Sequence, residues 1–202
     1  VEGYVASGAL SVSWYRKAFL DPAEDSFADA EESISEIDPG VGGLRFLPHL
    51  GGAGTPYWDD HSRGAFVGID ETHERFHFLR AVLEGLAFEL AVVLEGLETA
   101  NGTIHEVVVM GGGTASPAWL RILADVLNRP LILSTTNEGS ALGAAVLAAA
   151  GTGLVSGGVT AAVGAMVHRA DRIKPDPTSA ELYAKFSADY RRIYPALRAL
   201  SQ

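Results

Sequence analysis

The chain of 202 residues is 48% hydrophobic, enough to bury the core of one large domain or two small ones. Its 25 acidic and 15 basic residues give a formal charge of −10, which opposes binding to nucleic-acid phosphates. The absence of cysteine excludes disulfides and thiolate metal sites and is compatible with a reducing compartment, so the default expectation is a cytoplasmic protein. The most apolar segment, residues 141–155, is shorter than the roughly 20 residues that span a bilayer. We therefore expect neither nucleic acid nor membrane as a partner.

The first part of the chain predicts one helix, an acidic segment, a strand and a long loop. Residues 8–20 have a helical pattern that ends at Asp21-Pro22, and the acidic residues 21–38 are interpreted as a solvated helix with its loops. A strand is expected over residues 44–47. It runs into LPHLGGAGTPYWDDHSRGAF, whose glycines and prolines forbid regular structure. Because the chain begins with valine rather than methionine, we expect it to be a segment of a longer protein.

The middle of the chain predicts a helix, a strand and a second helix. Thr72 is the expected N-cap of a long helix that reaches about residue 100, and residues 104–110 are expected to form a buried strand. Three glycines follow the strand at once, and Ser116 and Pro117 suit the N-cap and first position of the next helix. This order of strand, glycine turn and helix favours one α/β domain.

The last part of the chain repeats the order of strand and helix. Residues 131–134 predict a strand, residues 140–151 predict a buried helix of small residues, and a final helix is expected over residues 179–200. Pro195 should bend or break that final helix. Its expected buried residues are Leu182, Phe186, Tyr190, Ile193 and Leu197.

The glycine turn in VVVMGGGTASPAW is the first candidate site. Glycines between a strand and a helix let a ligand ring or phosphate approach the backbone, and the helix N-terminus favours anionic groups. A dinucleotide-binding fold would also place an acid at the end of the next strand, but residues 134–136 are serine and threonine. The alternative is a tight turn that needs glycine only for packing.

The loop over residues 51–60 is the second candidate. Its backbone N–H groups are of the kind that cradle phosphates, and Asp59 and Asp60 are available to a metal-bound water. The alternative is a loop that only turns a corner, with these acids capping it or facing solvent.

The string His73-Glu74-Arg75-Phe76-His77 matches the H-E-x-x-H signature of zinc proteases. On a helix, both histidines would lie on the polar flank beside Arg80 and Glu84, away from the apolar stripe. A zinc hydrolase built on His73 and His77 is thus a remote alternative to an exposed helix start. No metal ligand is assigned.

In order and spacing, these motifs resemble the FGGY carbohydrate kinases. The resemblance covers VEGYVASGALSVSWYRKAF, LPHLGGAGTPYWDDHSRGAFVGI, HFLRAVLEGLAFEL, MGGGTASPAWLRILADVLNRP and EGSALGAAVLAAAGTG. Residues 64–69, followed after seven residues by His77-Phe78 and then residues 81–84, match the family's second signature position by position. The match also accounts for the H-E-x-x-H string, because the signature accepts several polar residues where His77 stands.

The resemblance implies an α/β fold, an actin-like ATPase (ribonuclease H-like) domain with a mixed sheet flanked by helices. Residues 1–202 would be the C-terminal, nucleotide-binding domain of a kinase whose N-terminal, sugar-binding domain lies outside this chain. By position, Gly112, Gly113 and Ser116 would line the adenine side of the site and Gly52 the phosphate side.

ATP and Mg²⁺ are the implied cofactors, and a sugar or polyol is the implied substrate. A xylulose-like ketose is favoured by GGGTASPAWLRILADVL and YRRIYPALRAL, and glycerol by TPYWD. No residue is assigned as the catalytic base, which is expected upstream, and a homodimer is possible. The alternative function is a non-catalytic interaction module with an actin-like fold.

Overall fold

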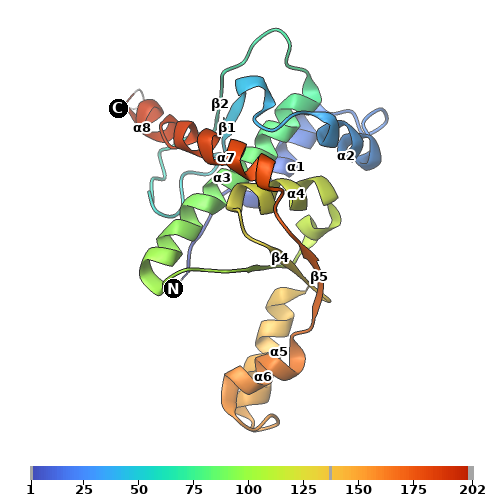
Figure 1. Cartoon of the computed structure of the whole chain (residues 1–202), viewed down its shortest axis with the longest axis vertical. Helices are drawn as coiled ribbons and strands as arrows, with labels where there is room; N and C mark the ends of the chain where they lie inside the picture. The colour runs from blue at the N-terminus through green and yellow to red at the C-terminus, as the bar shows by residue number, and fades with distance from the viewer. Residues whose placement is uncertain (1, 137, 200–202) are drawn as a thin grey trace.

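The computed structural model describes residues 2–136 and 138–199, which form a helical body with a small sheet and a projecting helical pair (Figure 1). No helix among these residues is both long and apolar enough to cross a membrane. In chain order the elements are α1 (Gly8–Phe19), α2 (Phe27–Glu36), η1 (Val41–Gly43), β1 (Arg45–Leu47), β2 (Ala65–Val67), α3 (Arg75–Asn101), β3 (Val107–Val109), η2 (Gly112–Ala115), α4 (Pro117–Leu127), β4 (Leu131–Ser134), α5 (Gly139–Gly151), α6 (Gly158–Met166), β5 (Arg169–Ile173), α7 (Pro177–Tyr190) and α8 (Ile193–Arg198).

Helix α3 is the centre of the body and contacts α1, α2, α4, α7 and β1. Every residue from 79 to 89 is buried, including the flank with Arg80 and Glu84 that the sequence pattern assigns to solvent. Gly85 allows this packing, since a Cβ there would lie 2.1 Å from the carbonyl oxygen of Phe46 in β1. The helix also begins later than predicted. Its N-cap is Glu74, in a capping box with His77, whereas the Thr72 hydroxyl donates to Asp70.

The sheet formed by β3, β4 and β5 is mixed, as expected. Strand β3 pairs with β4 in parallel and β4 pairs with β5 antiparallel, while β1 and β2 form a separate antiparallel pair. The strands over residues 44–47 and 131–134 are confirmed, and the strand expected over residues 104–110 is confined to Val107–Val109. The short elements β2, β5 and α6 have no counterpart in the prediction.

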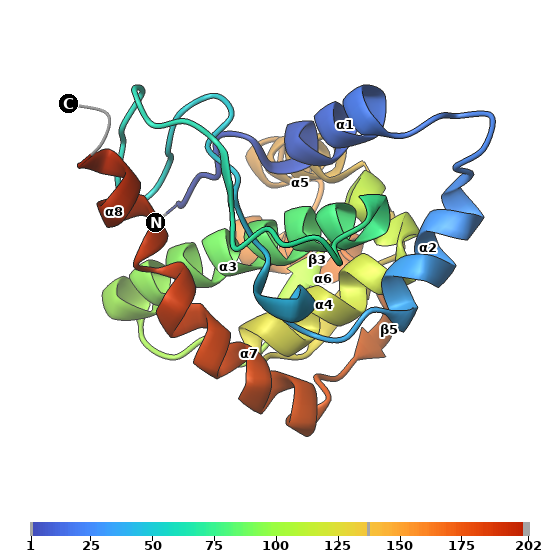
Figure 2. The same cartoon turned by 90° about the horizontal axis from the view of Figure 1, so that it is seen from above.

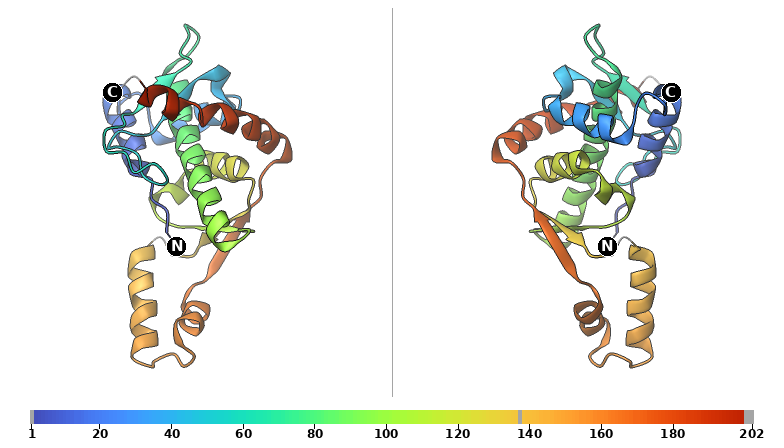
Figure 3. Two further views of the ribbon diagram at one scale, coloured as in Figure 1. Left: turned by 90° about the vertical axis from the view of Figure 1, so that its left-hand side faces the viewer. Right: turned by 90° about the vertical axis from the view of Figure 1, so that its right-hand side faces the viewer.

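Helices α5 and α6 contact each other and project from the body, as the two side views show (Figure 3). The prediction of a buried helix is therefore wrong for α5, in which Val146 and Ala149 are the buried residues. Leu147 is 62% exposed and Leu154, which follows α5, is 82% exposed. Apolar composition predicts burial only where a neighbouring element is present to cover it, and the body does not reach this helix.

The predicted C-terminal helix is two helices. Helix α7 begins at Pro177 with Asp176 as its N-cap, and the chain turns at residues 191–192 before α8. Pro195 lies in the first turn of α8, where a backbone N–H has no partner within the helix. Tyr190 and Ile193 are buried as predicted, but Leu182 is 37% exposed and Tyr183 is buried in its place.

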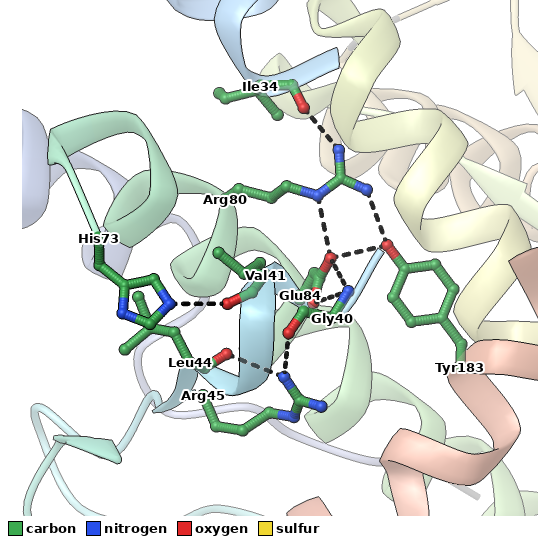
Figure 4. A network of polar contacts seen from close by, with 9 residues as sticks. All are labelled: Ile34, Gly40, Val41, Leu44, Arg45, His73, Arg80, Glu84 and Tyr183. Carbon is green, nitrogen blue, oxygen red and sulfur yellow. Dashed lines mark hydrogen bonds and ion pairs between the residues drawn. The ribbon is translucent and has the colours of Figure 1, made fainter. Parts of the chain in front are cut away.

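A buried polar network joins α3 to α2, to the Gly40 turn and to α7 (Figure 4). Glu84 accepts hydrogen bonds from Arg80 Nε at 3.0 Å, the Tyr183 hydroxyl at 2.8 Å and the Gly40 N–H at 3.1 Å. Arg80 also donates to the carbonyl of Ile34 in α2. Burial raises the pKa of the Glu84 carboxyl, and the Arg80 guanidinium opposes that rise. Replacing Glu84 would therefore leave a buried cation and several donors without their acceptor.

We predict that Glu84→Ala lowers the free energy of unfolding by about 3–5 kcal/mol, the usual cost of breaking a buried ion pair by removing one partner. The matched control is Glu181→Ala, which breaks the exposed pair with Lys185 on α7 and should leave the stability nearly unchanged, because solvent screens that pair. Urea unfolding followed by circular dichroism measures both. Equal effects of the two substitutions would contradict the structural role of Glu84.

Candidate functional site

A cavity of about 430 Å³ lies between α1, α2, α3 and the start of α4, and three of the four predicted site residues line it. Figure 2 shows α1 on one side of α3, α4 and α7 on the other side, and α2 beside α4. The wall of the cavity is mainly apolar, and the volume of the cavity is within the range of small-molecule pockets. The residues that line the cavity include Gly8, Ser13, Arg16, Phe27, Glu31, Gly112, Gly113 and Ser116.

Ser116 caps α4 as predicted, because its hydroxyl oxygen accepts a hydrogen bond from the Trp119 N–H at 3.1 Å. The same hydroxyl donates to Oε1 of Glu31, and Oε2 of Glu31 accepts from the Ala118 N–H at 3.0 Å. A carboxylate from α2 thus occupies the N-terminus of α4, where the helix dipole stabilises negative charge. The one proton of the Ser116 hydroxyl is therefore donated to Glu31.

Gly112 and Gly113 form part of the cavity wall at the 3₁₀ turn η2, just after β3. The expected turn is therefore present, and its backbone is open to the cavity. The preceding Gly111 has φ +96°, which favours glycine. A Cβ at Gly113 would lie 3.2 Å from the indole nitrogen of Trp119, so this glycine also permits close packing of α4.

Helices α1 and α2 supply cavity residues that the sequence analysis does not identify. Arg16 lies over the ring of Phe27, 5.7 Å from its centroid, and joins the two helices at the cavity. The acidic segment was expected to be solvated, yet α2 buries Ala30 and Ile34 and presents Glu31 to the cavity. The spacing of Phe27, Ala30 and Ile34 by three and four residues is the signal that could have revealed this buried face.

The loop over residues 51–60, called the glycine loop from here on, lies next to the start of α1. Its residue Gly52 is not among the residues that line the cavity. The Gly51 N–H donates to the Ser7 hydroxyl at 2.9 Å, directly before α1. The N–H groups of Gly52 and Ala53 donate to carbonyls of His49 and Asp59. These three amides therefore have partners in the protein, one in Ser7 and two in backbone carbonyls of the loop and its start. By contrast, the first turn of α1 has no side-chain cap.

Asp59 stabilises the loop, as its alternative interpretation expects. Its carboxylate accepts hydrogen bonds from the Tyr194 hydroxyl at 2.8 Å and from the His61 N–H at 3.0 Å. The Tyr194 hydrogen bond is the main reason why the pKa of Asp59 is lowered. Asp59 thereby attaches the loop to α8.

His73 and His77 do not have the geometry of a zinc-protease helix. His73 precedes α3, and its Nε2 lies 3.0 Å from the carbonyl of Val41 while its Nδ1 accepts from the Asp70 N–H. The Nδ1 of His77 accepts from the Glu74 N–H in the capping box. Both ring nitrogens of His73 are thus engaged with the backbone, and its side chain is 2% exposed rather than solvated. In residues 2–136 and 138–199, no three His, Cys, Asp or Glu side chains come together as a metal site.

Residues 1–152 match the model of the C-terminal domain of the FGGY family of carbohydrate kinases. The chain belongs to this family. It is 36% identical to the xylulose kinase of Bacillus subtilis (strain 168) over 151 residues, 75% of this chain and 30% of that protein. It is 37% identical to the glycerol kinase of Ralstonia pickettii (strain 12J) over 154 residues, 76% of this chain and 30% of that protein.

The structure is similar to that of a ligand-bound xylulose kinase from Lactobacillus acidophilus, with a TM-score of 0.87 and 28% identity. The match covers 98% of this chain and 39% of that one. FGGY kinases use ATP and have the actin-like ATPase fold, so the predicted fold class is confirmed. The chain spans from 30% to 39% of the length of these three relatives.

We predict that Gly52→Ala lowers stability by about 1–3 kcal/mol, because Gly52 has φ +95° and a Cβ would lie 3.1 Å from the Asp59 carbonyl oxygen. Gly143→Ala is the matched control. A Cβ at Gly143 meets no atom within 4 Å, and alanine in a helix should stabilise the protein by roughly 0.5–1 kcal/mol. Thermal unfolding of both variants provides the comparison, and a neutral Gly52→Ala would contradict the strained backbone.

Proposed function

We propose that this chain is the nucleotide-binding domain of an ATP-dependent carbohydrate kinase and that its cavity holds the nucleoside of ATP or ADP. The observation that carries the proposal is the joining of Gly112, Gly113 and Ser116 to α1 and α2 around one apolar cavity. A purine ring suits such a wall, and the glycines allow it to approach the backbone closely.

The charges around the cavity give the nucleotide a direction. Glu31 occupies the N-terminus of α4, so a phosphate placed there would meet a carboxylate. Two such charges 4 Å apart repel by about 4 kcal/mol at the effective dielectric of a protein surface. The base therefore belongs near Ser116, and the phosphates belong near the uncapped start of α1, where Gly8 lines the cavity. Gly52 is one residue from the Gly51–Ser7 contact, which supports its place on the phosphate side.

Mg²⁺ is proposed to enter with the nucleotide. This ion keeps several waters and binds largely through substrate phosphates, so it needs few protein ligands. When bound, it neutralises charge on the phosphates during transfer. The chain's own contribution is to orient the base and to hold the phosphates at α1.

The proposed reaction is transfer of the ATP γ-phosphate to a hydroxyl of a sugar or polyol, with a xylulose-like ketose ahead of glycerol. The xylulose kinase of Bacillus subtilis and the glycerol kinase of Ralstonia pickettii match this chain with similar identity. Both xylulose and glycerol are therefore kept as candidate substrates. We propose that an N-terminal domain supplies the sugar site and the catalytic base, and that the enzyme is cytoplasmic. The chain by itself should bind nucleotide without turnover, because phosphoryl transfer needs both reactants positioned.

We predict that Ser13→Trp weakens ADP binding by about tenfold or more, because Ser13 lines the cavity from α1 and an indole there would fill it. The matched control is Lys17→Trp, one turn further along α1 at an exposed position outside the cavity lining, which should leave the affinity unchanged. Titration of the ¹⁵N-labelled chain with ADP, followed by NMR, measures affinities in the weak range. Equal affinities of the two variants would place the nucleotide elsewhere.

A chimaera tests the domain assignment. We expect this chain, exchanged for the matching segment of the Bacillus subtilis xylulose kinase, to support ATP consumption with D-xylulose, and the Ser13→Trp chimaera to lose most of it. A well-folded chimaera that binds ADP but never consumes ATP would contradict the kinase assignment and favour the non-catalytic alternative.

A further inference from the structure

We infer that Glu31 reads the base of the bound nucleotide by accepting a hydrogen bond from the exocyclic 6-amino group of adenine. The inference rests on the proposed function, since it assumes a nucleotide in the cavity. It assigns specificity to α2, a helix outside the glycine turn.

Glu31 is placed where a base would meet it. Among the described residues that line the cavity, Glu31 is the one carboxylate and Arg16 the one cation, and most of the others are apolar. A polar group in an otherwise apolar wall dominates recognition, because a polar ligand group that finds no hydrogen-bond partner there loses its bound water and gains nothing in return.

The hydrogen-bond inventory leaves Glu31 able to accept more. A carboxylate offers about four acceptor positions, and two are used here, by the Ser116 hydroxyl and the Ala118 N–H. Ser116 cannot donate to the base in this arrangement, since its one proton goes to Glu31. Recognition at this wall therefore requires a donor on the ligand, and the 6-amino group of adenine is one.

The carboxylate is held in place for this role. Helix α2 begins with a capping box between Ser26 and Asp29, and its residues Ala30 and Ile34 are buried on either side of Glu31 in sequence. The two bonds to the start of α4 fix the carboxylate itself. A preorganised acceptor loses little freedom on binding, which favours discrimination between donors and acceptors.

The chemistry predicts which bases are disfavoured. Hypoxanthine has a 6-oxo acceptor in place of the amine, and unsubstituted purine has hydrogen there. A hydrogen bond to a charged group corresponds to about ten- to a hundredfold in affinity. We expect the wild-type chain to bind ADP at least about tenfold more tightly than IDP or purine riboside diphosphate.

The test compares these three nucleotides with the wild-type chain, Glu31→Gln and Glu32→Gln by ¹⁵N NMR titration. In Glu31→Gln the amide oxygen accepts from the Ala118 N–H, and the NH₂ group takes the place of Oε1 beside the Ser116 hydroxyl. The wall then presents donors, from the amide and from the released Ser116 hydroxyl, so the preference for ADP over IDP should fall to about unity or reverse. Glu32→Gln removes the same charge from an exposed neighbour on α2 and should keep the wild-type preference. A loss of helix capping alone would weaken all three nucleotides together and leave their ratios unchanged.

The outcomes separate this inference from the proposed function. If the wild-type chain binds all three nucleotides equally, or if Glu31→Gln keeps the wild-type ratio, Glu31 does not read the base although the nucleotide site stands. If no nucleotide binds the wild-type chain, the proposed function fails and this inference fails with it. If Glu31→Gln does not fold, equal binding of the three nucleotides to the wild-type chain would still overturn the inference.

Discussion

The carboxylate of Glu84 is the constraint on which the rest of the body depends. It lies in the middle of a helix that is buried on all sides over residues 79–89, and desolvating a charge there is costly unless every acceptor position is matched. Arg80, Tyr183 and the Gly40 N–H supply the match from three different parts of the chain. Because Arg80 also holds the carbonyl of Ile34, the network fixes the end of α2, and Ile34 is itself part of the cavity wall. The core and the candidate site therefore share one set of contacts.

A second buried network on α3 holds the two ends of the glycine loop, at His49 and Ser62. Glu89 accepts from the Tyr190 hydroxyl at 2.7 Å, and the ring of His49 lies between Glu89 and the hydroxyl of Ser62. The order serine, histidine, carboxylate is that of a hydrolase triad, but here the serine meets Nδ1 and the acid meets Nε2, the reverse of that arrangement. Ser62 is also only 8% exposed. The four side chains of this cluster are buried, and they join the loop to α3 and α7.

The sequence predicts an element or a contact correctly where the interacting residues lie close together in the chain. Ser116 and Pro117 start α4 as predicted because capping is decided within four residues. The role of Glu31 was missed because its partner, Ser116, is 85 residues away and an acid on a helix usually faces water. The burial of Arg80 and Glu84 was missed for the same reason, since their partner Tyr183 is about 100 residues away. Helix α5 shows the opposite error, because its sequence is apolar but the fold does not cover it.

Binding of an anion by a chain with a formal charge of −10 is reasonable once the positions of the charges are considered. Charges further apart than about 8 Å are largely screened at physiological ionic strength, so the groups in contact with the phosphates decide the outcome. The charged residues of α2 itself are all acidic, and Glu31 already occupies the start of α4. Arg16 of α1, which lies over Phe27, is the one cation among the described residues that line the cavity. Near the start of α1 the groups are backbone N–H groups without a side-chain cap, where the helix dipole favours an anion by about 0.3–1 kcal/mol. The same carboxylate that excludes phosphate from one end of the cavity is then free to select the base there, so orientation and base recognition follow from a single residue.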